Sequence, residues 1–466
     1  MKKATIVLTL ALSACAGARP YVPVGAQVSA PAAWRDAGAP AGDVGPRWWE
    51  SFGDPVLASL VEQATVNNPD LGMAAARVDE ARAQFRLAAA NRLPDIVLSG
   101  AGGRDRHVSP FGQAIEEWAG QGQVVASYDL DLFGRLRNAD AAARAELLAS
   151  EAARDSVRLG IASATASGYV GLRALDARLA VLRETLAARG ASLKLAQRRA
   201  DAGYAPALEL RQAQAEYTAT AQLVPPAELA IRQQENGLSV LLGTNPGPIP
   251  RGLDLGRLEL PPVSPILPSA LLRRRPDIAA AEAHLVAADH SLDSARAAFL
   301  PDVQLNGSAG YAASSLLLNN PIGIFSLGAS ILQPLFDGGR LRARADGASA
   351  RRDAAAFAYR QTALNAFREV EDALAAISYN NLQEGQVAEQ RVATADLLRL
   401  ASNRYRSGYT PYLDQIDAER ALLATDLALV QVRAARLTAA IALYQALGGG
   451  WNEGLSPQAS ASATLR

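Results

Sequence analysis

The chain has 466 residues, enough for two or three ordinary domains, and its 46 basic and 46 acidic side chains balance at neutral pH. Without a basic excess, a nucleic-acid partner is not expected. Aromatic residues make up only 6% of the chain, while alanine, leucine, arginine, glutamine and glutamate abound. This composition favours long helices over a compact aromatic core.

The amino terminus has the features of a secretory signal. Lys2 and Lys3 precede a short apolar run, residues 4–12, which is too short to span a membrane. The run ends in the sequence LSAC, where Cys15 is the only cysteine of the chain. These residues resemble a bacterial lipobox, which implies cleavage before Cys15 and attachment of lipid to it. The alternative is an ordinary signal peptide with an incidental cysteine. By the same resemblance, Ala16 implies sorting to the outer membrane.

A repeated segment predicts that the rest of the chain is a tandem duplication. The sequence RADAGYAPALELRQA at 199–213 recurs as RYRSGYTPYLDQIDA at 404–418, at an offset of 205 residues (408 − 203). Gly203 and Gly408 can each end a helix in the left-handed conformation, and a proline three residues later can open the next helix. Each segment is therefore predicted to form the tip of a helical hairpin.

The repeats, composition and periodicity divide the chain into six parts. We expect a signal peptide at 1–14, a lipid-anchored linker at 15–47, a first repeat at 48–243, a proline- and glycine-rich connector at 244–268, a second repeat at 269–448 and a loose tail at 449–466.

Each repeat contains two segments with the alternating periodicity of strands. After an LPD sequence, apolar and polar residues alternate, as expected for a strand with one apolar face and one solvent-exposed polar face. Segments of about ten residues with this pattern are typical of transmembrane β-barrels. The segments lie at residues 96–99, 123–132, 303–311 and 325–333, and the intervening residues 103–122 and 312–321 are predicted to be loops on one side of the membrane.

From each returning strand to the hairpin tip the pattern is helical. Residues 136–200 and 341–406 have no obvious interruption, so each helix would be about 100 Å long. The chain then returns through 207–242 and 412–447. Only the first return contains a Pro-Pro pair, Pro225-Pro226, which must break or kink it.

Four strands cannot close a transmembrane barrel, since the smallest common ones need about eight. Open strand edges are not tolerated in lipid. The sequence therefore predicts a ring-shaped homo-oligomer, in which other copies complete the barrel. The number of copies does not follow from the residues.

Six motifs, in this order and with this duplication, point to a known family. They are WWESFGDPVL at 48–57, SYDLDLFGRLR at 127–137, LLGTNPG at 241–247, RRRPDIAAAE at 273–282, QPLFDGGRLRA at 333–343 and RYRSGYTPYLDQIDAE at 404–419. The chain resembles, from Trp48 to Trp451, the TolC-type outer-membrane efflux channels, and within them the lipid-anchored NodT/OprM-like branch.

The resemblance implies a mainly α fold with a transmembrane β part. It implies a homotrimer whose twelve-stranded β-barrel continues into a long α-helical barrel that crosses the periplasm. It also implies an outer-membrane location and two partners, a periplasmic adaptor protein and an inner-membrane pump, commonly of the proton-driven multidrug type. The covalent lipid on Cys15 is the only attached group that it implies.

The resemblance also assigns roles at the hairpin tips. Asp414 and Asp417 match gate aspartates, Tyr405 matches a tyrosine that ties neighbouring hairpins together, and Glu209 stands where the first hairpin supplies an acidic partner. Thr410 departs from the pattern, because some members have an arginine there. Without the resemblance, these carboxylates read as solvated charges near a helix start.

The tips are also where the family meets its adaptor. By this resemblance the contact residues are Gly203, Tyr204, Gly408 and Tyr409.

The most favoured function is a passive exit duct for drugs or other small molecules. Metal-ion efflux and type I protein secretion are alternatives, although two methionines and no histidine cluster give little support to a metal cargo. A lipid-anchored structural protein of the envelope is an alternative from another class. No nucleophile–base pair or phosphate loop is present, so neither an enzyme nor a metal site is expected.

Overall fold

The computed structural model describes residues 23–35, 44–204, 206–260, 267–316 and 321–451. Cys15 and the expected signal peptide lie outside these residues. The chain divides into two compact units, and each takes segments from both repeats. One contains residues 77–151, 280–362 and the described part of 1–28, and the other contains 29–76, 152–279 and the described part of 363–466.

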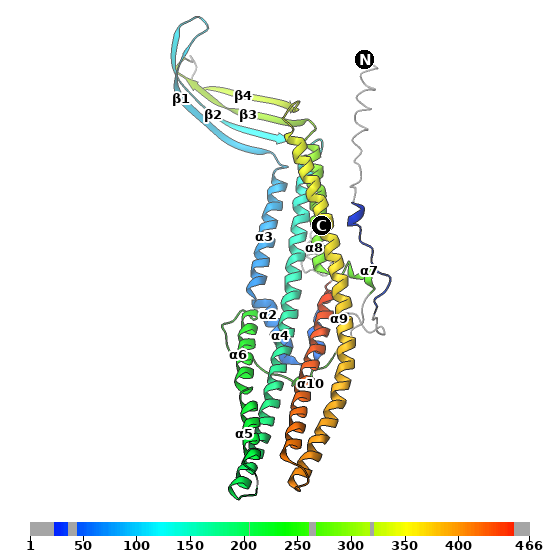
Figure 1. Cartoon of the computed structure of the whole chain (residues 1–466). Coiled ribbons are helices and arrows are strands. Elements are labelled where there is room, and N and C mark those ends of the chain that lie inside the picture. Colours follow the sequence, from blue (N-terminus) through cyan, green and yellow to red (C-terminus); the bar gives the residue numbers. More distant parts are fainter. Residues whose placement is uncertain (1–22, 36–43, 205, 261–266, 317–320, 452–466) are drawn as a thin grey trace. The chain divides into compact units, whose positions relative to one another are not determined.

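The first unit contains a four-stranded antiparallel sheet. Its strands follow the chain in the order β1-β2-β3-β4, so β1 and β4 each pair with one neighbour only (Figure 1). The strands are β1 (Asp95–Val108), β2 (Ala114–Asp129), β3 (Asp302–Ser314) and β4 (Ile322–Leu332). Both sheet edges are therefore free of partners in the described part of this chain.

The register gives the sheet one apolar and one polar face. Leu98 pairs with Val124, Val124 with Ala309, and Ala309 with Phe325, so these four side chains share a face. In the single chain the exposed fractions are 83% for Leu98 and 87% for Phe325. The opposite face bears Ser99, Gln123, Ser127, Gln304, Asn306, Ser308, Ser326 and Ser330. This is the pattern of a barrel wall with lipid on one side and water on the other.

The predicted loop at residues 103–122 is wrong. Strand β1 continues to Val108 and β2 begins at Ala114, so only residues 109–113 connect them. The prediction failed because residues 104–107 alternate in charge rather than in hydrophobicity, and residues 116–117 are two consecutive glutamates. The loop predicted at 312–321 begins too early, because β3 continues to Ser314, and residues 317–320 lie outside the described part of the chain.

The helices have the predicted lengths and interruptions. Helices α4 and α9 contain 67 residues each. The Pro-Pro pair lies in the first turn of α6 and separates it from α5, whereas α10 is continuous over 35 residues. The helices are α2 (Pro55–Asn67), α3 (Pro69–Ala90), α4 (Arg135–Asp201), α5 (Ala207–Ala221), α6 (Val224–Leu241), α7 (Pro268–Leu271), α8 (Pro276–Ala297), α9 (Arg340–Arg406) and α10 (Tyr412–Ala446), with short 3-10 helices η1 (Val24–Ala26), η2 (Trp48–Phe52) and η3 (Leu255–Arg257).

The largest core cluster lies in the second unit and begins with the WWESF motif. The ring of Trp48 stacks on that of Tyr444 of α10, with 5.1 Å between centroids and 13° between planes. Phe52 is fully buried and lies beside the same tyrosine. The short helix η2 is thus anchored to the last helix, α10.

Of the described helices, α10 alone is long and apolar enough to cross a membrane by length and composition. Of its apolar window 44% is buried inside the protein, including Leu437, Ile441 and Leu443. Its first turns carry Asp414 and Asp417. We therefore interpret α10 as a packed core helix, and the strands as the part of the chain that enters the membrane.

Candidate functional site

The two hairpin tips form as the glycines predict. Gly203 has φ 73° just after α4, and Gly408 has φ 77° just after α9. The next residues close the helix ends, because the Tyr204 and Tyr409 amides donate to carbonyls five residues earlier, at 2.8 and 2.9 Å. The side chains of Tyr204 and Tyr409 point outward, with exposed fractions of 87% and 81%. Each tip therefore presents one aromatic ring.

The structure brings Tyr405 and Glu209 together. The Tyr405 hydroxyl, at the end of α9, donates a hydrogen bond to Glu209 Oε1, in the first turn of α5. The Arg199 guanidinium of α4 lies 4.9 Å from the centroid of the Tyr405 ring and 4.0 Å from the Glu209 carboxylate. One chain thus ties its first hairpin to its second close to the tips.

Tyr405 also belongs to a small apolar cluster, to which all four hairpin helices contribute. The Tyr405 and Tyr412 rings are 5.1 Å apart, and they pack with Ala196, Ala213 and Ile416. Burial raises the pKa of the Tyr405 hydroxyl to about 12, and the neighbouring Glu209 adds to the rise. The hydroxyl therefore keeps its proton at neutral pH and remains a donor.

Asp414 and Asp417 lie on the exposed side of the first turns of α10. The Asp417 carboxylate is 3.6 Å from the Arg420 guanidinium. The Asp414 side chain makes no hydrogen bond or ion pair with the described residues. The two carboxylates are three residues apart and therefore share one helix face. Neither of them takes part in the Tyr405–Glu209 contact.

Thr410 follows the second tip. Its hydroxyl oxygen is buried and has no hydrogen-bond partner within the described ranges. The threonine brings no charge to the tip. In the described chain, the connection between the hairpins at the tips depends on Tyr405, Glu209 and Arg199.

A buried ionic cluster below the tips was not predicted from the sequence. Arg189 of α4 is 4% exposed, and its guanidinium lies 2.9 Å from Glu216 of α5 and 3.7 Å from Glu419 of α10. Gln415 donates to Glu419 Oε1 at 2.8 Å. Arg420 donates to Glu216 through Nε at 3.0 Å. These five side chains join the two hairpins a second time.

Burial raises the pKa of Glu419, and the nearby Glu216 contributes to the rise, while Gln415 and Arg189 oppose it. One signal of this cluster exists in the sequence. Glu419 continues the i, i+4, i+7 stripe begun by Tyr412 and Ile416, so a carboxylate occupies a position where an apolar side chain is expected.

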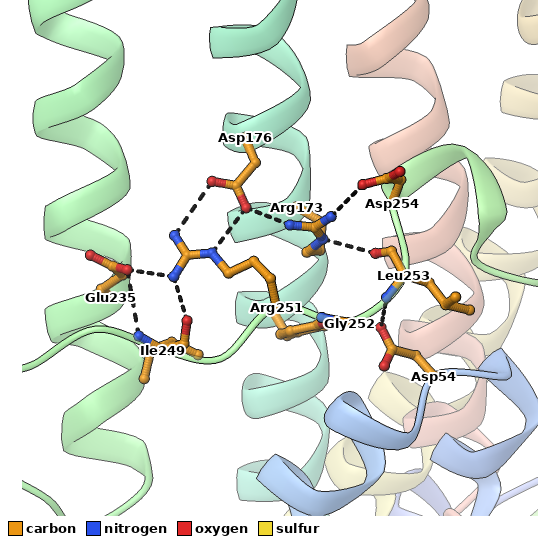
Figure 2. A network of polar contacts seen from close by, with 10 residues as sticks. Asp54, Arg173, Asp176, Glu235, Ile249, Arg251, Gly252, Leu253 and Asp254 are labelled. Carbon is orange, nitrogen blue, oxygen red and sulfur yellow. Dashed lines mark hydrogen bonds and ion pairs between the residues drawn. The ribbon is translucent and has the colours of Figure 1, made fainter.

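A second polar network holds the connector between the repeats (Figure 2). Asp54 is 2% exposed and caps α2 by accepting the Val56 amide at 2.8 Å. The same carboxylate accepts the Leu253 amide at 2.9 Å and the Tyr169 hydroxyl at 2.8 Å. Gly252 approaches so closely that an added Cβ would lie 2.1 Å from Asp54 Oδ1. Only glycine fits there.

Two arginines extend this network. Arg173 of α4 donates to the Leu253 carbonyl at 2.8 Å and to Asp176 at 2.7 Å. Arg251 of the connector reaches Asp176 at 3.1 Å and Glu235 of α6 at 2.5 Å (Figure 2). These hydrogen bonds and ion pairs therefore attach the connector to two helices of the first repeat, α4 and α6.

We expect Asp54→Ala to destabilise the second unit by roughly 3 kcal/mol, because it removes a helix cap and leaves the partly buried Leu253 amide and the buried Tyr169 hydroxyl without an acceptor. Unfolding of purified protein in mild detergent, followed by circular dichroism, measures this. Asp254→Ala is the control, since the Asp254 side chain is 78% exposed and, among the described residues, pairs only with Arg173. Equal losses from the two variants would contradict a central role for Asp54.

In the parts of the chain that the structure describes, no group of three or more histidine, cysteine or acidic side chains is arranged to hold a metal ion.

A four-stranded sheet with a lipid-type face and two open edges, together with two long helical hairpins, defines a subunit of an outer-membrane channel that extends into the periplasm. Comparison with known proteins confirms this class. The chain belongs to the outer membrane efflux protein family, whose sequence model matches residues 60–244 and 267–449.

Curated relatives cover most of the chain. The toluene efflux pump outer membrane protein TtgC of Pseudomonas putida is 35% identical over 87% of this chain and 85% of its own length. The cation efflux system protein CusC of Escherichia coli is also 35% identical, over 87% of this chain and 88% of its own length. The chain is thus equally similar to members named for very different cargoes.

A solved structure supports the fold. The outer membrane protein VceC of Vibrio cholerae superposes with a TM-score of 0.82 at 29% sequence identity, covering 88% of this chain and all of that one. The protein is therefore an outer-membrane efflux channel, in agreement with the expected fold class, function and location.

Proposed function

We propose that three copies of this chain close a twelve-stranded barrel in the outer membrane and gate it at the hairpin tips. The observation that carries this proposal is the pair of open sheet edges on a sheet whose apolar face is exposed. Because unpaired strand edges are not tolerated in lipid, β4 of one copy must pair with β1 of the next. The family resemblance supports three as the number of copies.

In mild detergent we expect the purified protein to run as a complex of three chains that dissociates only on heating. A single chain that is stable without lipid or detergent would contradict the channel.

The channel is proposed to work passively within a tripartite system. The adaptor would contact the outward-facing tips at Gly203, Tyr204, Gly408 and Tyr409, where two tyrosines are exposed. The inner-membrane pump, proposed to be of the proton-driven multidrug type, would supply the energy, so this chain needs no enzymatic chemistry of its own.

The proposed cargo is drugs or other small molecules. We propose that cargo choice resides in the pump rather than in this chain, which the equal likeness to TtgC and CusC supports. Metal ions and secreted proteins remain the alternative cargoes. Resistance of a deletion strain to a panel of antibiotics, solvents and metals distinguishes them.

Lipidation of Cys15 is proposed to hold the mature amino terminus in the outer membrane, with residues 15–47 as the linker. Palmitate labelling of the protein, compared with Cys15→Ser, tests it. Equal labelling of both proteins would contradict the lipobox.

Asp414 and Asp417 are proposed to form a ring of six carboxylates in the trimer that attracts cations. In planar bilayers, Asp414→Ala with Asp417→Ala should weaken block by divalent cations roughly tenfold, or about 1.4 kcal/mol of ion binding. Asp396→Ala is the control, since Asp396 is exposed on α9 beside Arg399. Unchanged conductance and block in the double variant would remove both aspartates from the gate.

A further inference from the structure

The β1–β2 hairpin extends beyond the rest of the sheet (Figure 1). Pairing between β2 and β3 begins at Ala119 with Ser314, whereas β1 and β2 continue to pair from Arg104 with Trp118 to Val108 with Ala114. A tilted strand crosses the hydrocarbon in about 9 to 11 residues. Counted from Asp95, this length ends near Arg104. The extension therefore begins where β1 leaves the membrane, at the end of the sheet remote from the helices.

The alternation of β1 assigns each residue of the extension to a face. Arg104 and Arg106 lie on the same face as Ile96 and Leu98, which is the lipid-type face of the sheet. Trp118 is opposite Arg104 on that face, 63% exposed, and its ring centroid is 5.7 Å from the Arg104 guanidinium. Tryptophan at the end of an apolar band is typical of the membrane interface.

Charge is unevenly divided between the two faces of the extension. On the lipid-type face, Glu116 lies opposite Arg106 in the register but forms its ion pair with the diagonal Arg104. The Arg106 side chain is exposed and makes no ion pair or hydrogen bond with the described residues. The opposite face bears the cross-strand pair Asp105 and Glu117. The unpaired positive charge therefore lies on the side of the lipid head groups, and the carboxylate pair lies on the side of the lumen.

We propose that Arg106, together with Arg104 above Trp118, binds the phosphate groups of outer-leaflet lipid where the barrel meets the external surface. Guanidinium groups form bidentate, charge-assisted hydrogen bonds with phosphate. An arginine beside an anionic lipid surface gains about fivefold in affinity from this attraction. The inference rests on the closed barrel proposed above.

The test uses the full-length trimer, delipidated in mild detergent and titrated with diphosphorylated lipid A, with retained lipid counted by native mass spectrometry. We expect Arg106→Gln to weaken lipid A binding roughly fivefold and Arg104→Gln with Arg106→Gln to weaken it more. Glu116→Gln should strengthen it, because it removes the competing carboxylate and releases Arg104. His107→Gln, on the other face, and Arg399→Gln, on α9, control for hairpin perturbation and for net charge.

Two further titrations identify the ligand group. Monophosphorylated lipid A should bind more weakly than the diphosphorylated form, and free inorganic phosphate should not displace lipid at equal concentration. Equal binding of both lipids, or equal binding by wild type and Arg106→Gln trimers, would overturn the proposal while leaving the channel intact. Failure of the wild-type chain to form a trimer would instead contradict the proposed function.

Discussion

Replacing Tyr405 by phenylalanine is expected to open the channel, with a severalfold rise in mean conductance across planar bilayers. The variant keeps the ring that packs against Tyr412 but loses the hydroxyl that donates to Glu209. A hydrogen bond to a charged group contributes about 1.5–3 kcal/mol, and the proposed trimer contains three such bonds. Losing them shifts the equilibrium between closed and open tips towards open.

Tyr409→Phe is the matched control, because Tyr409 lies four residues away and its side chain is 81% exposed. It should leave the conductance unchanged. Glu209→Leu, which has no side-chain acceptor, should resemble Tyr405→Phe, and the double variant should add little to either single change, since both remove the same bond. Wild-type conductance in Tyr405→Phe, or fully additive effects, would show that this contact does not hold the gate closed.

Replacing Arg189 by methionine is expected to have the largest effect on stability. Methionine preserves much of the volume but leaves Glu216 and Glu419 buried without their shared cation. Breaking a buried charge cluster in this way costs about 3–5 kcal/mol. Denaturant unfolding in detergent measures the loss. Arg183→Met, which breaks the exposed pair with Glu228, should cost less than about 1 kcal/mol.

The same cluster predicts a pH dependence. Because burial raises the pKa of Glu419 above its ordinary value of 4.5, the native state binds this proton more tightly than the unfolded state. The contribution of this bound proton to the free energy of unfolding is therefore complete below pH 4.5, and it is lost as the pH rises through the native pKa of Glu419. Arg189→Met removes a positive charge that lowers the pKa of Glu419. The variant should therefore raise that pKa further and widen the pH range over which the proton stabilises the native state.

Acid should therefore partly restore the stability of Arg189→Met. Glu419→Gln in the same background should restore it at neutral pH and remove the dependence, because the amide cannot ionise. An Arg189→Met variant that is equally unstable at pH 5 and pH 7 would show that Glu419 is not the group left unpaired.

The predictable elements are those with local signals. The tips at Gly203 and Gly408 follow from glycine and proline chemistry, and the strands around Leu98 and Phe325 follow from a two-residue period. The open sheet edges follow from counting strands. These features depend on short stretches of chain or on simple geometry, so the sequence alone predicts them.

Other features depend on which distant segments meet. The cap of α2 by Asp54 is a local signal, but its bond to Leu253, 199 residues away, is not. Arg189 and Glu216 look like surface charges, because burial of an ion pair leaves no periodic pattern. The pairing of Tyr405 with Glu209 was expected only through the family resemblance, and its geometry appears only in the folded chain.

The central claim is that this sheet is one third of a closed barrel. Cysteine cross-linking between strand edges tests this claim most directly. Within one chain β1 and β4 are separated by two strands, or about 14 Å, too far for a disulfide. Cysteines are placed in pairs at Val97, Ser99 or Ala101 on β1 and at Ser326, Gly328 or Ser330 on β4. Chains that carry only one of the two introduced cysteines, in addition to native Cys15, are the controls.

We expect at least one pair to give, on oxidation, a covalent ladder that ends at three chains. A ladder that continues beyond three, or no cross-link from any pair in a properly inserted protein, would contradict the three-chain barrel.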